Sequence, residues 1–235
     1  MSSGRTLDKK EILAGHWLLA EFSAAQLEIL ARHARLATHK ANQVIFRKDD
    51  PGNSLMAIVH GRVKITSTSY EGKEVVLNII DAGELFGEIA LLDGRPRTAD
   101  ASTMIDTELL VLERRDFIPV IQRNPEVCVR LIAVLCERLR RTSSQVEDLL
   151  FLDQPGRLAK TLLRLIREFG EAAGGGARMD MRLTQRELGA IVGMSREEIN
   201  RQLARLRDTG LINVDHGRIV VPDVAAFERY AQGAD

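Results

Sequence analysis

A glycine, an acid and an arginine lie close together in the stretch 86–99, which reads FGEIALLDGRPRTA. A short helical run after Gly87 would aim free backbone amides and the positive helix end at one point, which suits an anion. Arg97 would add charge-assisted hydrogen bonds to a phosphate. Glu88 would repel a phosphate, so we expect it to bind hydroxyl groups such as those of a ribose. The three residues together predict a site for a sugar phosphate.

A second group of chemistry-bearing residues lies near the C-terminus, where two helix-start patterns follow each other. The segments 184–187 (TQRE) and 195–198 (SREE) each place a hydroxyl at an N-cap and a glutamate three residues later, the pattern of a capping box. Gly193 lies between them. Two short helices joined by a glycine-containing turn form a helix-turn-helix. The segment 210–221 then predicts a small hairpin, which makes the motif a winged variant.

The second of these helices opens with side chains that could read bases. In a helix-turn-helix, the first turns of the second helix enter the major groove. Arginine donates to guanine and glutamate accepts from cytosine. The alternative is that Glu197 and Arg201, four residues apart, form only a surface ion pair; their place on the second helix favours base reading. The predicted DNA-contacting residues are Thr184, Gln185, Ser195, Arg196, Glu197, Asn200 and Arg201.

A long helix is predicted from about residue 125, because no glycine or proline occurs before Pro155. Its apolar residues recur at spacings of four and three, which is an a/d heptad seam that needs a partner. The two-fold-related copy of the chain is the simplest partner, and packing on the chain's own β domain is the alternative. The seam consists of Cys128, Ile132, Leu135, Leu139, Thr142, Val146 and Leu149.

These sites need elements to position them. Between about residues 36 and 112, short β-branched runs alternate with turn signals, which is typical of an antiparallel barrel or sandwich. Strands are predicted at 43–47, 54–60, 63–69, 74–80 and 107–113. A glycine-rich stretch at 174–176 predicts a surface loop. Asp153, followed by Pro155, predicts the N-cap of a new helix, so we expect a hinge and domain boundary between Leu152 and Asp153.

Composition limits the other function classes. The sequence has 33 Lys and Arg against 33 Asp and Glu. Net charge alone would therefore rank nucleic acid and anionic membranes low as partners, but the charges are sorted by position. The longest aliphatic run, 131–136, is too short for a bilayer, and no secretory signal precedes it, so we expect a cytoplasmic protein. Two cysteines, Cys128 and Cys136, are too few for a disulfide framework or an iron–sulfur cluster.

The stretch 86–99 resembles the phosphate-binding cassette of cyclic-nucleotide-binding domains. The chain from about 17 to 222 resembles the Crp/Fnr transcription regulators, most closely their cAMP-responsive subgroup. RTS at 141–143, FLD at 151–153, LTQRE at 183–187 and VGMSRE at 192–197 carry this resemblance. It implies an α+β fold: a polar tail (1–16), a cyclic-nucleotide-binding antiparallel β-roll (17–124), a coiled-coil dimerisation helix (125–152) and a winged helix-turn-helix (153–235).

The resemblance also implies roles for residues. Glu88 would bind the ribose, Arg97 and the neighbouring amides the cyclic phosphate, and Thr98 the phosphate or the purine. Thr142 and Ser143 would reach the purine from the two long helices of a homodimer. The implied ligand is cAMP, and Thr98 leaves cGMP open. The implied cyclic-nucleotide-binding residues are Gly87, Glu88, Ile89, Ala90, Arg97, Thr98, Thr142 and Ser143.

The implied function is a transcription regulator whose ligand repositions two recognition helices on palindromic double-stranded DNA with TGTGA-like half-sites. RNA polymerase would be a partner if the regulator is an activator. Three alternatives remain open: a regulator of another signal, a regulator that binds DNA without ligand, and a nucleotide-processing enzyme with Glu88 as base. No nucleophile–base pair, metal-ligand cluster or P-loop supports an enzyme, so no catalytic residue and no metal are expected. The histidines that could bind haem are expected to be ordinary ones: His16, His33, His39, His60 and His216.

Overall fold

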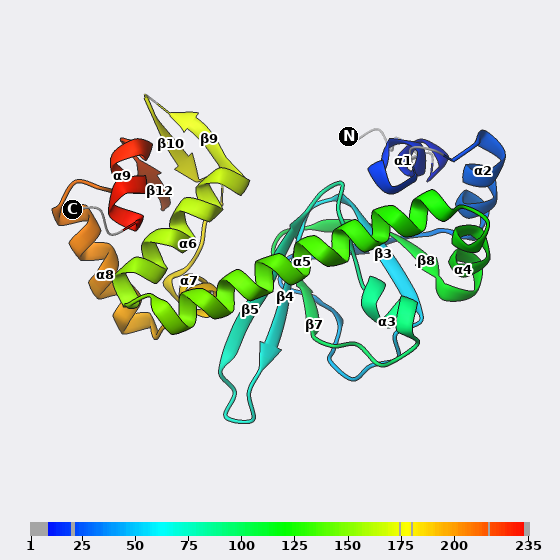
Figure 1. Cartoon of the computed structure of the whole chain (residues 1–235), viewed down its shortest axis with the longest axis horizontal. Helices are drawn as coiled ribbons and strands as arrows, with labels where there is room; N and C mark the ends of the chain where they lie inside the picture. Colours follow the sequence, from blue (N-terminus) through cyan, green and yellow to red (C-terminus); the bar gives the residue numbers. More distant parts are fainter. Residues whose placement is uncertain (1–8, 20–21, 174, 180, 216, 233–235) are drawn as a thin grey trace. The chain divides into compact units, whose positions relative to one another are not determined.

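The computed structural model describes residues 9–19, 22–173, 175–179, 181–215 and 217–232 (Figure 1). Two compact units divide the chain. The first comprises the described residues up to Gly72 and Val76–Leu139, and the second comprises Lys73–Val75 and the described residues from Arg140 onward. Among the described residues, no helix is both long enough and apolar enough to cross a membrane. His216, one of the histidines considered above, lies outside the described residues.

The first unit is built around two four-stranded sheets. One sheet has the order β1-β8-β3-β6 and the other β2-β7-β4-β5. Their bounds are β1 (Arg35–His39), β2 (Val44–Phe46), β3 (Ser54–His60), β4 (Arg62–Thr68), β5 (Glu74–Asp81), β6 (Leu85–Phe86), β7 (Asp100–Thr103) and β8 (Thr107–Glu113). The pairs β1/β8, β2/β7, β3/β6, β3/β8 and β4/β7 are antiparallel, which confirms the antiparallel β-roll. The strands expected at 54–60 and 107–113 have the bounds predicted for them, whereas β1 and β7 were not among the predicted strands.

A core fills the space between the two sheets. Met56 and Val111 face it from one sheet, and Val63 and Ala101 face it from the other. A sharp turn at Gly61 joins β3 to β4, with φ of +109°. A Cβ at this position would stand 2.4 Å from the hydroxyl of Thr107, so both the conformation and the space require glycine.

Helices cover the outer face of the β1-β8-β3-β6 sheet and form a second core with it. Their bounds are α1 (Lys9–Gly15), the 3-10 helix η1 (Trp17–Leu19), α2 (Ala24–His33) and α4 (Arg114–Gln122). Residues 9–15 were expected in a polar tail. They form α1 instead, because Leu13 is buried in this core with 2% of its surface exposed. A capping box of Ser23 and Gln26 begins α2.

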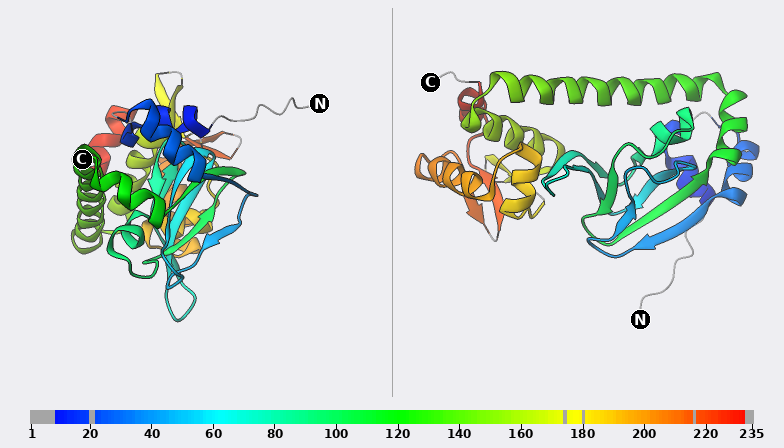
Figure 2. Two further views of the ribbon diagram at one scale, coloured as in Figure 1. Left: turned by 90° about the vertical axis from the view of Figure 1, so that its right-hand side faces the viewer. Right: turned by 90° about the horizontal axis from the view of Figure 1, so that it is seen from below.

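Helix α5 (Pro125–Phe151) is one unbroken helix of 27 residues (Figure 2). Its first turns are anchored, since Val127 and Leu131 are buried in the outer core of the first unit. Further along, several apolar side chains of α5 are exposed, including Ile132 and Leu139. The division between the two compact units falls within this helix, between Leu139 and Arg140.

The second unit holds the helix-turn-helix and a small sheet of order β11-β12-β10-β9. Its elements are α6 (Gln154–Phe169), β9 (Gly170–Ala173), β10 (Gly176–Met179), α7 (Gln185–Val192), α8 (Arg196–Asp208), β11 (Asn213–Asp215), β12 (Arg218–Val221) and α9 (Val224–Ala231). As predicted, Asp153 is the N-cap of α6, accepting a 2.9 Å hydrogen bond from the amide of Gly156. The loop expected at 174–176 is wrong for Gly176, which begins β10 where a Cβ would lie 2.0 Å from the carbonyl oxygen of Val221.

Candidate functional site

The cassette begins at Gly87, the N-cap of the short helix α3 (Glu88–Asp93). Gly87 has φ of +83°, and a Cβ there would stand 2.6 Å from Nη1 of Arg97 and 3.1 Å from the carbonyl oxygen of Ser54. Glycine is therefore required twice, by the left-handed backbone and by the close approach of Arg97. The first amides of α3 have no acceptor four residues earlier in the helix.

Arg97 is a buried cation, with 4% of its surface exposed. Nη1 donates to the carbonyl oxygen of Gly87 (2.9 Å), and Nη2 donates to the carbonyl oxygen (2.8 Å) and hydroxyl (2.9 Å) of Ser54. The guanidinium carbon lies 4.3 Å from the ring centroid of Phe46. Desolvation lowers the pKa of Arg97, and the nearby charge of Glu88 opposes this shift.

No carboxylate forms an ion pair with Arg97 within the described part of the chain, and the buried Nε of Arg97 has no hydrogen-bond partner there. A buried charge without a partner is costly, so a structure that keeps one is set up for an anion. This arrangement fits the expectation that Arg97 binds a phosphate.

Glu88, the first residue of α3, is buried even more deeply, with 1% of its surface exposed. Arg138 of α5 forms an ion pair with Oε1 of Glu88 and also donates to the carbonyl oxygen of Leu85. Oε2 of Glu88 is buried and has no hydrogen-bond partner. One carboxylate oxygen is thus held in place while the other is available to accept from a hydroxyl.

Arg138, Ser54 and Phe46 are part of this arrangement but were missed from the sequence. Arg138 follows Val127 and Leu131 on the helical stripe of α5 that faces the β-roll, seven residues after Leu131. A charged residue in an otherwise apolar stripe is a signal that a buried partner faces it. Ser54 and Phe46 gave no such signal, because their contacts depend on how two strands meet.

The other predicted ligand residues lie in different surroundings. The side chain of Ala90 packs against the loop at Gly52, where an added Cβ would come within 2.1 Å of the Cβ of Ala90. Ile89 and Thr98 are exposed at the surface of the first unit. Thr142 and Ser143 are exposed on the part of α5 that belongs to the second unit. The structure therefore brings together Gly87, Glu88, Ala90 and Arg97 from the predicted set.

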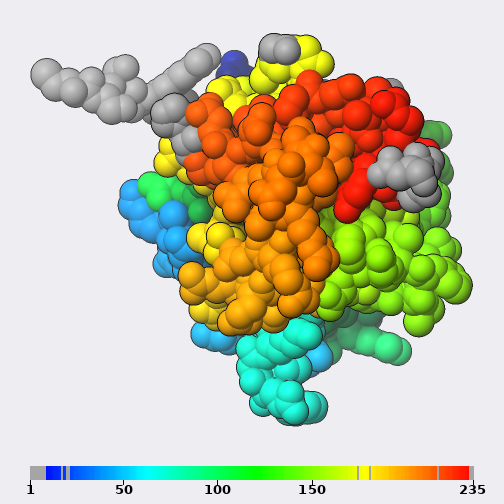
Figure 3. Space-filling view, turned by 90° about the vertical axis from the view of Figure 1, so that its left-hand side faces the viewer, coloured from blue at the N-terminus to red at the C-terminus, as the bar shows by residue number. Residues whose placement is uncertain are grey.

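The helix-turn-helix forms as two capped helices. Thr184 and Glu187 make the predicted capping box at the start of α7, and Gly193, with φ of +78°, ends that helix. Ser195 caps α8 by accepting from the amide of Glu198 (3.1 Å). In the second unit, α8 lies at the surface, where its residues are orange in Figure 3. Arg196, Glu197 and Arg201 are exposed there, as a base-reading role requires.

Two details of α8 differ from expectation. The second capping box is wrong, because the carboxylate of Glu198 turns to the amide nitrogen of Gln202 (2.7 Å) and to Arg201. The ion pair of Glu197 with Arg201, which was the alternative to base reading, is not seen among the described residues, where Arg201 pairs with Glu198. These hydrogen bonds, from Gln202 first and Arg201 second, lower the pKa of Glu198. Glu197 is left with an exposed carboxylate.

The predicted seam is a largely exposed stripe of α5. Leu139 is 68% exposed, and Ile132, Val146 and Leu149 are at least half exposed. Cys128 is half-buried at the start of the helix, where it packs against the outer core of the first unit. Leu152 and Asp153, where the sequence predicts a hinge, lie between α5 and α6. No group of three or more His, Cys, Asp and Glu that could hold a metal occurs among the residues that the structure describes.

Comparison with known proteins agrees with both halves of this description. The family described as "Cyclic nucleotide-binding domain" matches residues 36–124, and the "Crp-like helix-turn-helix domain" matches residues 156–230. A "CRP-like cAMP-activated global transcriptional regulator" of Mycobacterium tuberculosis is 33% identical over 222 residues, covering 94% of this chain and 99% of the relative. The "cAMP-activated global transcriptional regulator CRP" of Haemophilus influenzae is 35% identical, covering 83% of this chain and 87% of the relative.

Among solved structures, the c-di-GMP-responsive global regulator CLP of Xanthomonas campestris superposes with a TM-score of 0.73 at 26% identity, covering 85% of this chain and 99% of that one. Both relatives are named as transcription regulators and not as enzymes. The chain combines a cyclic-nucleotide-binding β-roll with a DNA-binding winged helix-turn-helix. It belongs to the Crp/Fnr family of transcription regulators, close to the cAMP receptor proteins.

Proposed function

We propose that this chain is a cAMP-responsive homodimeric transcription regulator. The observation that carries the proposal is that two buried charged groups of the cassette lack part of their ion-pair or hydrogen-bond partners. Among the described residues, Arg97 is a buried cation without an ion-paired carboxylate, and Glu88 has a buried oxygen without a hydrogen-bond donor. A cyclic phosphate would form an ion pair with Arg97 and accept further hydrogen bonds from the amides at Gly87, Ile89 and Ala90. A ribose hydroxyl would donate a hydrogen bond to the free oxygen of Glu88.

The choice of cAMP rests on the relatives and on the purine side of the site. The relatives from Mycobacterium tuberculosis and Haemophilus influenzae are named as cAMP-activated. Thr142 and Ser143, each contributed by one of two long helices, would bind the purine amine. Thr98, which would contact the phosphate or the purine, suits cGMP as well. Calorimetric titration with cAMP, cGMP and c-di-GMP in parallel should give the tightest binding for cAMP, and tighter binding of either other nucleotide would replace it as the ligand.

The role of Arg97 can be tested by substitution. Arg97→Ala should cost about 2–5 kcal/mol of cAMP binding free energy, because the phosphate charge is left unpaired. Arg97→Lys should lose part of this binding free energy, because lysine keeps the positive charge but lacks the two parallel N–H donors of the guanidinium. Arg95→Ala is the matched control, because Arg95 is exposed and two residues away. A change under about 1 kcal/mol for Arg97→Ala, with folding intact by circular dichroism, would refute the assigned role.

The exposed apolar stripe of α5 supports dimerisation through a second copy of the chain. Leu139 and Ile132 expose more than half of their surfaces, at a/d positions of a heptad repeat. Leu139→Arg should yield monomers in sedimentation velocity, whereas Arg140→Ala, at an exposed neighbouring position, should leave the dimer intact. A dimeric Leu139→Arg variant, or a monomeric parent protein, would overturn this part of the proposal.

We further propose that the ligand acts on the hinge at Leu152 and Asp153, which separates the domain of residues 17–124 and its helix from the winged domain of residues 153–235. Binding would reposition two recognition helices on a palindromic site with TGTGA-like half-sites. Arg196→Ala should cost roughly 1–3 kcal/mol of DNA binding and relax selection at one base pair. Selection from random DNA that returns an unchanged motif would refute this contact.

The gating itself is tested by a mobility-shift assay on a palindromic site with and without cAMP. Equal DNA affinity in both conditions would replace gating with constitutive binding. The site of action would be the cytoplasm. Transcription with purified RNA polymerase would then show whether the protein activates or represses.

A further inference from the structure

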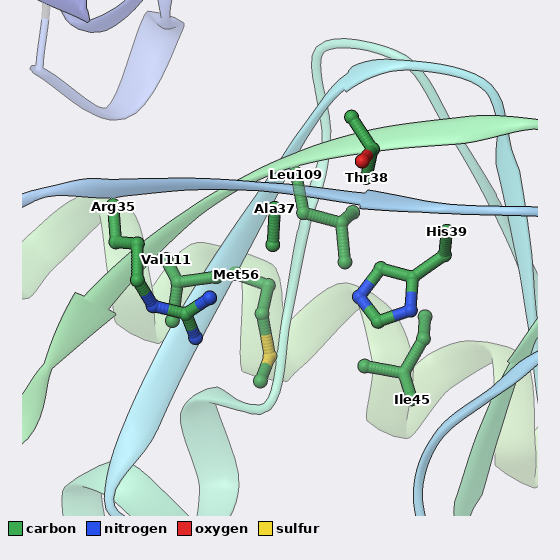
Figure 4. Close-up of a pocket in the computed structure, with 8 residues that line it drawn as sticks. All are labelled: Arg35, Ala37, Thr38, His39, Ile45, Met56, Leu109 and Val111. Carbon is green, nitrogen blue, oxygen red and sulfur yellow. The ribbon is translucent and has the colours of Figure 1, made fainter.

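A cavity of about 320 Å³ opens on the inner face of the β1-β8-β3-β6 sheet, at strand β1 (Figure 4). Residues from three strands of this sheet, together with Ile45 of β2, surround it. The lining residues are Arg35, Ala37, Thr38, His39, Ile45, Met56, Leu109 and Val111. Neither Glu88 nor Arg97 is among them, so the cavity is built from other residues than the cassette.

The cavity has an apolar wall and two polar groups. Met56, Leu109 and Val111 belong to the core between the sheets and form the wall. Arg35 and His39 alternate with Leu36 and Thr38 along β1, so their side chains leave the strand on the same side. Figure 4 shows the guanidinium of Arg35 and the imidazole of His39 flanking the open space.

Both polar groups have unused hydrogen-bonding capacity. Within the described residues, the exposed guanidinium of Arg35 forms no ion pair and no hydrogen bond with the protein, and Nδ1 of His39 is buried without a partner. An arginine offers two parallel donors that match a carboxylate. A cation and an unsatisfied imidazole beside an apolar wall are the features of a pocket for a small amphiphilic anion.

The volume limits the size of the occupant. Since a water occupies about 30 Å³, the cavity holds roughly ten water-sized groups. A medium-chain fatty acid or an aryl-alkanoic acid fits this volume. We propose that this cavity is a second ligand site, which binds a small monocarboxylate. The carboxylate binds Arg35 and also contacts His39, and the apolar body packs against Met56 and Val111.

Met56 connects this site to the cassette. Its side chain lines the cavity, and its sulfur lies 3.4 Å from the position that a Cβ on Gly87 would occupy. An occupant that contacts Met56 therefore contacts the residue behind the N-cap of α3. We expect the carboxylate to change the affinity for cAMP, and cAMP to change the affinity for the carboxylate by the same factor. This coupling rests on the proposed function, whereas binding of the carboxylate does not.

Isothermal titration calorimetry of the full chain with octanoate, in the absence of nucleotide, tests the site. Octanol is the neutral probe of equal chain length, and 3-phenylpropionate distinguishes an aromatic from an aliphatic ligand. The wild type should bind octanoate or 3-phenylpropionate at least tenfold more tightly than octanol. Arg35→Gln should remove this difference, and Ala37→Phe, which fills the cavity, should remove binding of both acids.

Arg47→Gln is the matched control, because Arg47 is exposed on the same unit and does not line the cavity. It should bind octanoate as the wild type does. No binding of either acid at millimolar concentration, or equal affinity in Arg35→Gln and the wild type, would overturn the proposal. Loss of octanoate binding in Arg97→Ala but not in Arg35→Gln would also overturn it, by placing the acid in the cassette. Octanoate binding without cAMP binding would refute the proposed function and leave this site standing.

Discussion

Arg138 offers the sharpest test of how the cassette is held together. Glu88 is 1% exposed and depends on Arg138 for its only ion pair among the described residues. Breaking a fully buried pair costs roughly 3–5 kcal/mol, because the remaining charge stays buried. The side chain of Arg138 is 25% exposed, so water can approach one side of this pair. We therefore expect Arg138→Met to lower the free energy of unfolding by about 2–3 kcal/mol.

Urea unfolding followed by tryptophan fluorescence measures this effect. Trp17 is the single tryptophan of the sequence and lies in the same compact unit as Glu88, so it reports on the relevant unit. Arg140→Met, at an exposed position of the same helix, is the control and should stay within about 0.5 kcal/mol of the wild type.

The double variant decides whether a stranded charge is the cause. Glu88→Gln combined with Arg138→Met removes both charges, so it should recover at least half of the stability that Arg138→Met loses. The reasoning fails if Arg138→Met is as stable as the Arg140→Met control. It also fails if the double variant is no more stable than Arg138→Met alone, because packing would then explain the loss.

Gly87→Ala should reduce cAMP affinity at least tenfold in calorimetry, since its Cβ would displace Nη1 of Arg97. Gly94→Ala should not, because Gly94 also has a positive φ but its Cβ would come no closer than 3.9 Å to a neighbour, Nη2 of Arg114. Burial lowers the pKa of His16, so the stability that it contributes is complete above its ordinary value of 6.5 and is lost as the pH falls. His16→Asn should therefore flatten the dependence of the urea midpoint on pH between about 7.5 and 5.5, and an unchanged slope would contradict this assignment. Ser195→Ala should destabilise the second unit by about 1 kcal/mol in thermal unfolding, through loss of the N-cap of α8; no shift would mean that another group caps the helix.

The sequence predicted those parts of the site that depend on local order. Gly87, Glu88 and Arg97 lie on one short segment whose turn and helix follow from residue types, and Thr184 with Glu187 is a box of four consecutive residues. The geometry of such patterns follows from the local sequence, because their contacts span at most ten residues.

The remaining parts required the fold. Arg138 is 50 residues away from Glu88 in the sequence, with β7, β8 and α4 between them, so no local pattern links the two. Glu198 shows the opposite failure. Its spacing from Ser195 predicts a capping box, but its carboxylate accepts a hydrogen bond from Gln202, one turn later, instead of from the backbone amide of Ser195. A pattern that allows two hydrogen-bonded arrangements does not determine which of them forms.

The contact between Gly52 and Ala90 has a consequence for how variants of this protein are interpreted. Neither residue has a side chain that could hydrogen-bond to a ligand. A Cβ added at position 52 would lie 2.1 Å from the Cβ of Ala90, which leaves no room for a larger residue. A saturation screen for nucleotide response would therefore mark position 52 as sharply as position 97, although only Arg97 is proposed to bind the phosphate. The two classes separate by thermal stability: the steric variants unfold at lower temperature, whereas a variant that lost only a ligand contact would retain the melting temperature of the ligand-free protein.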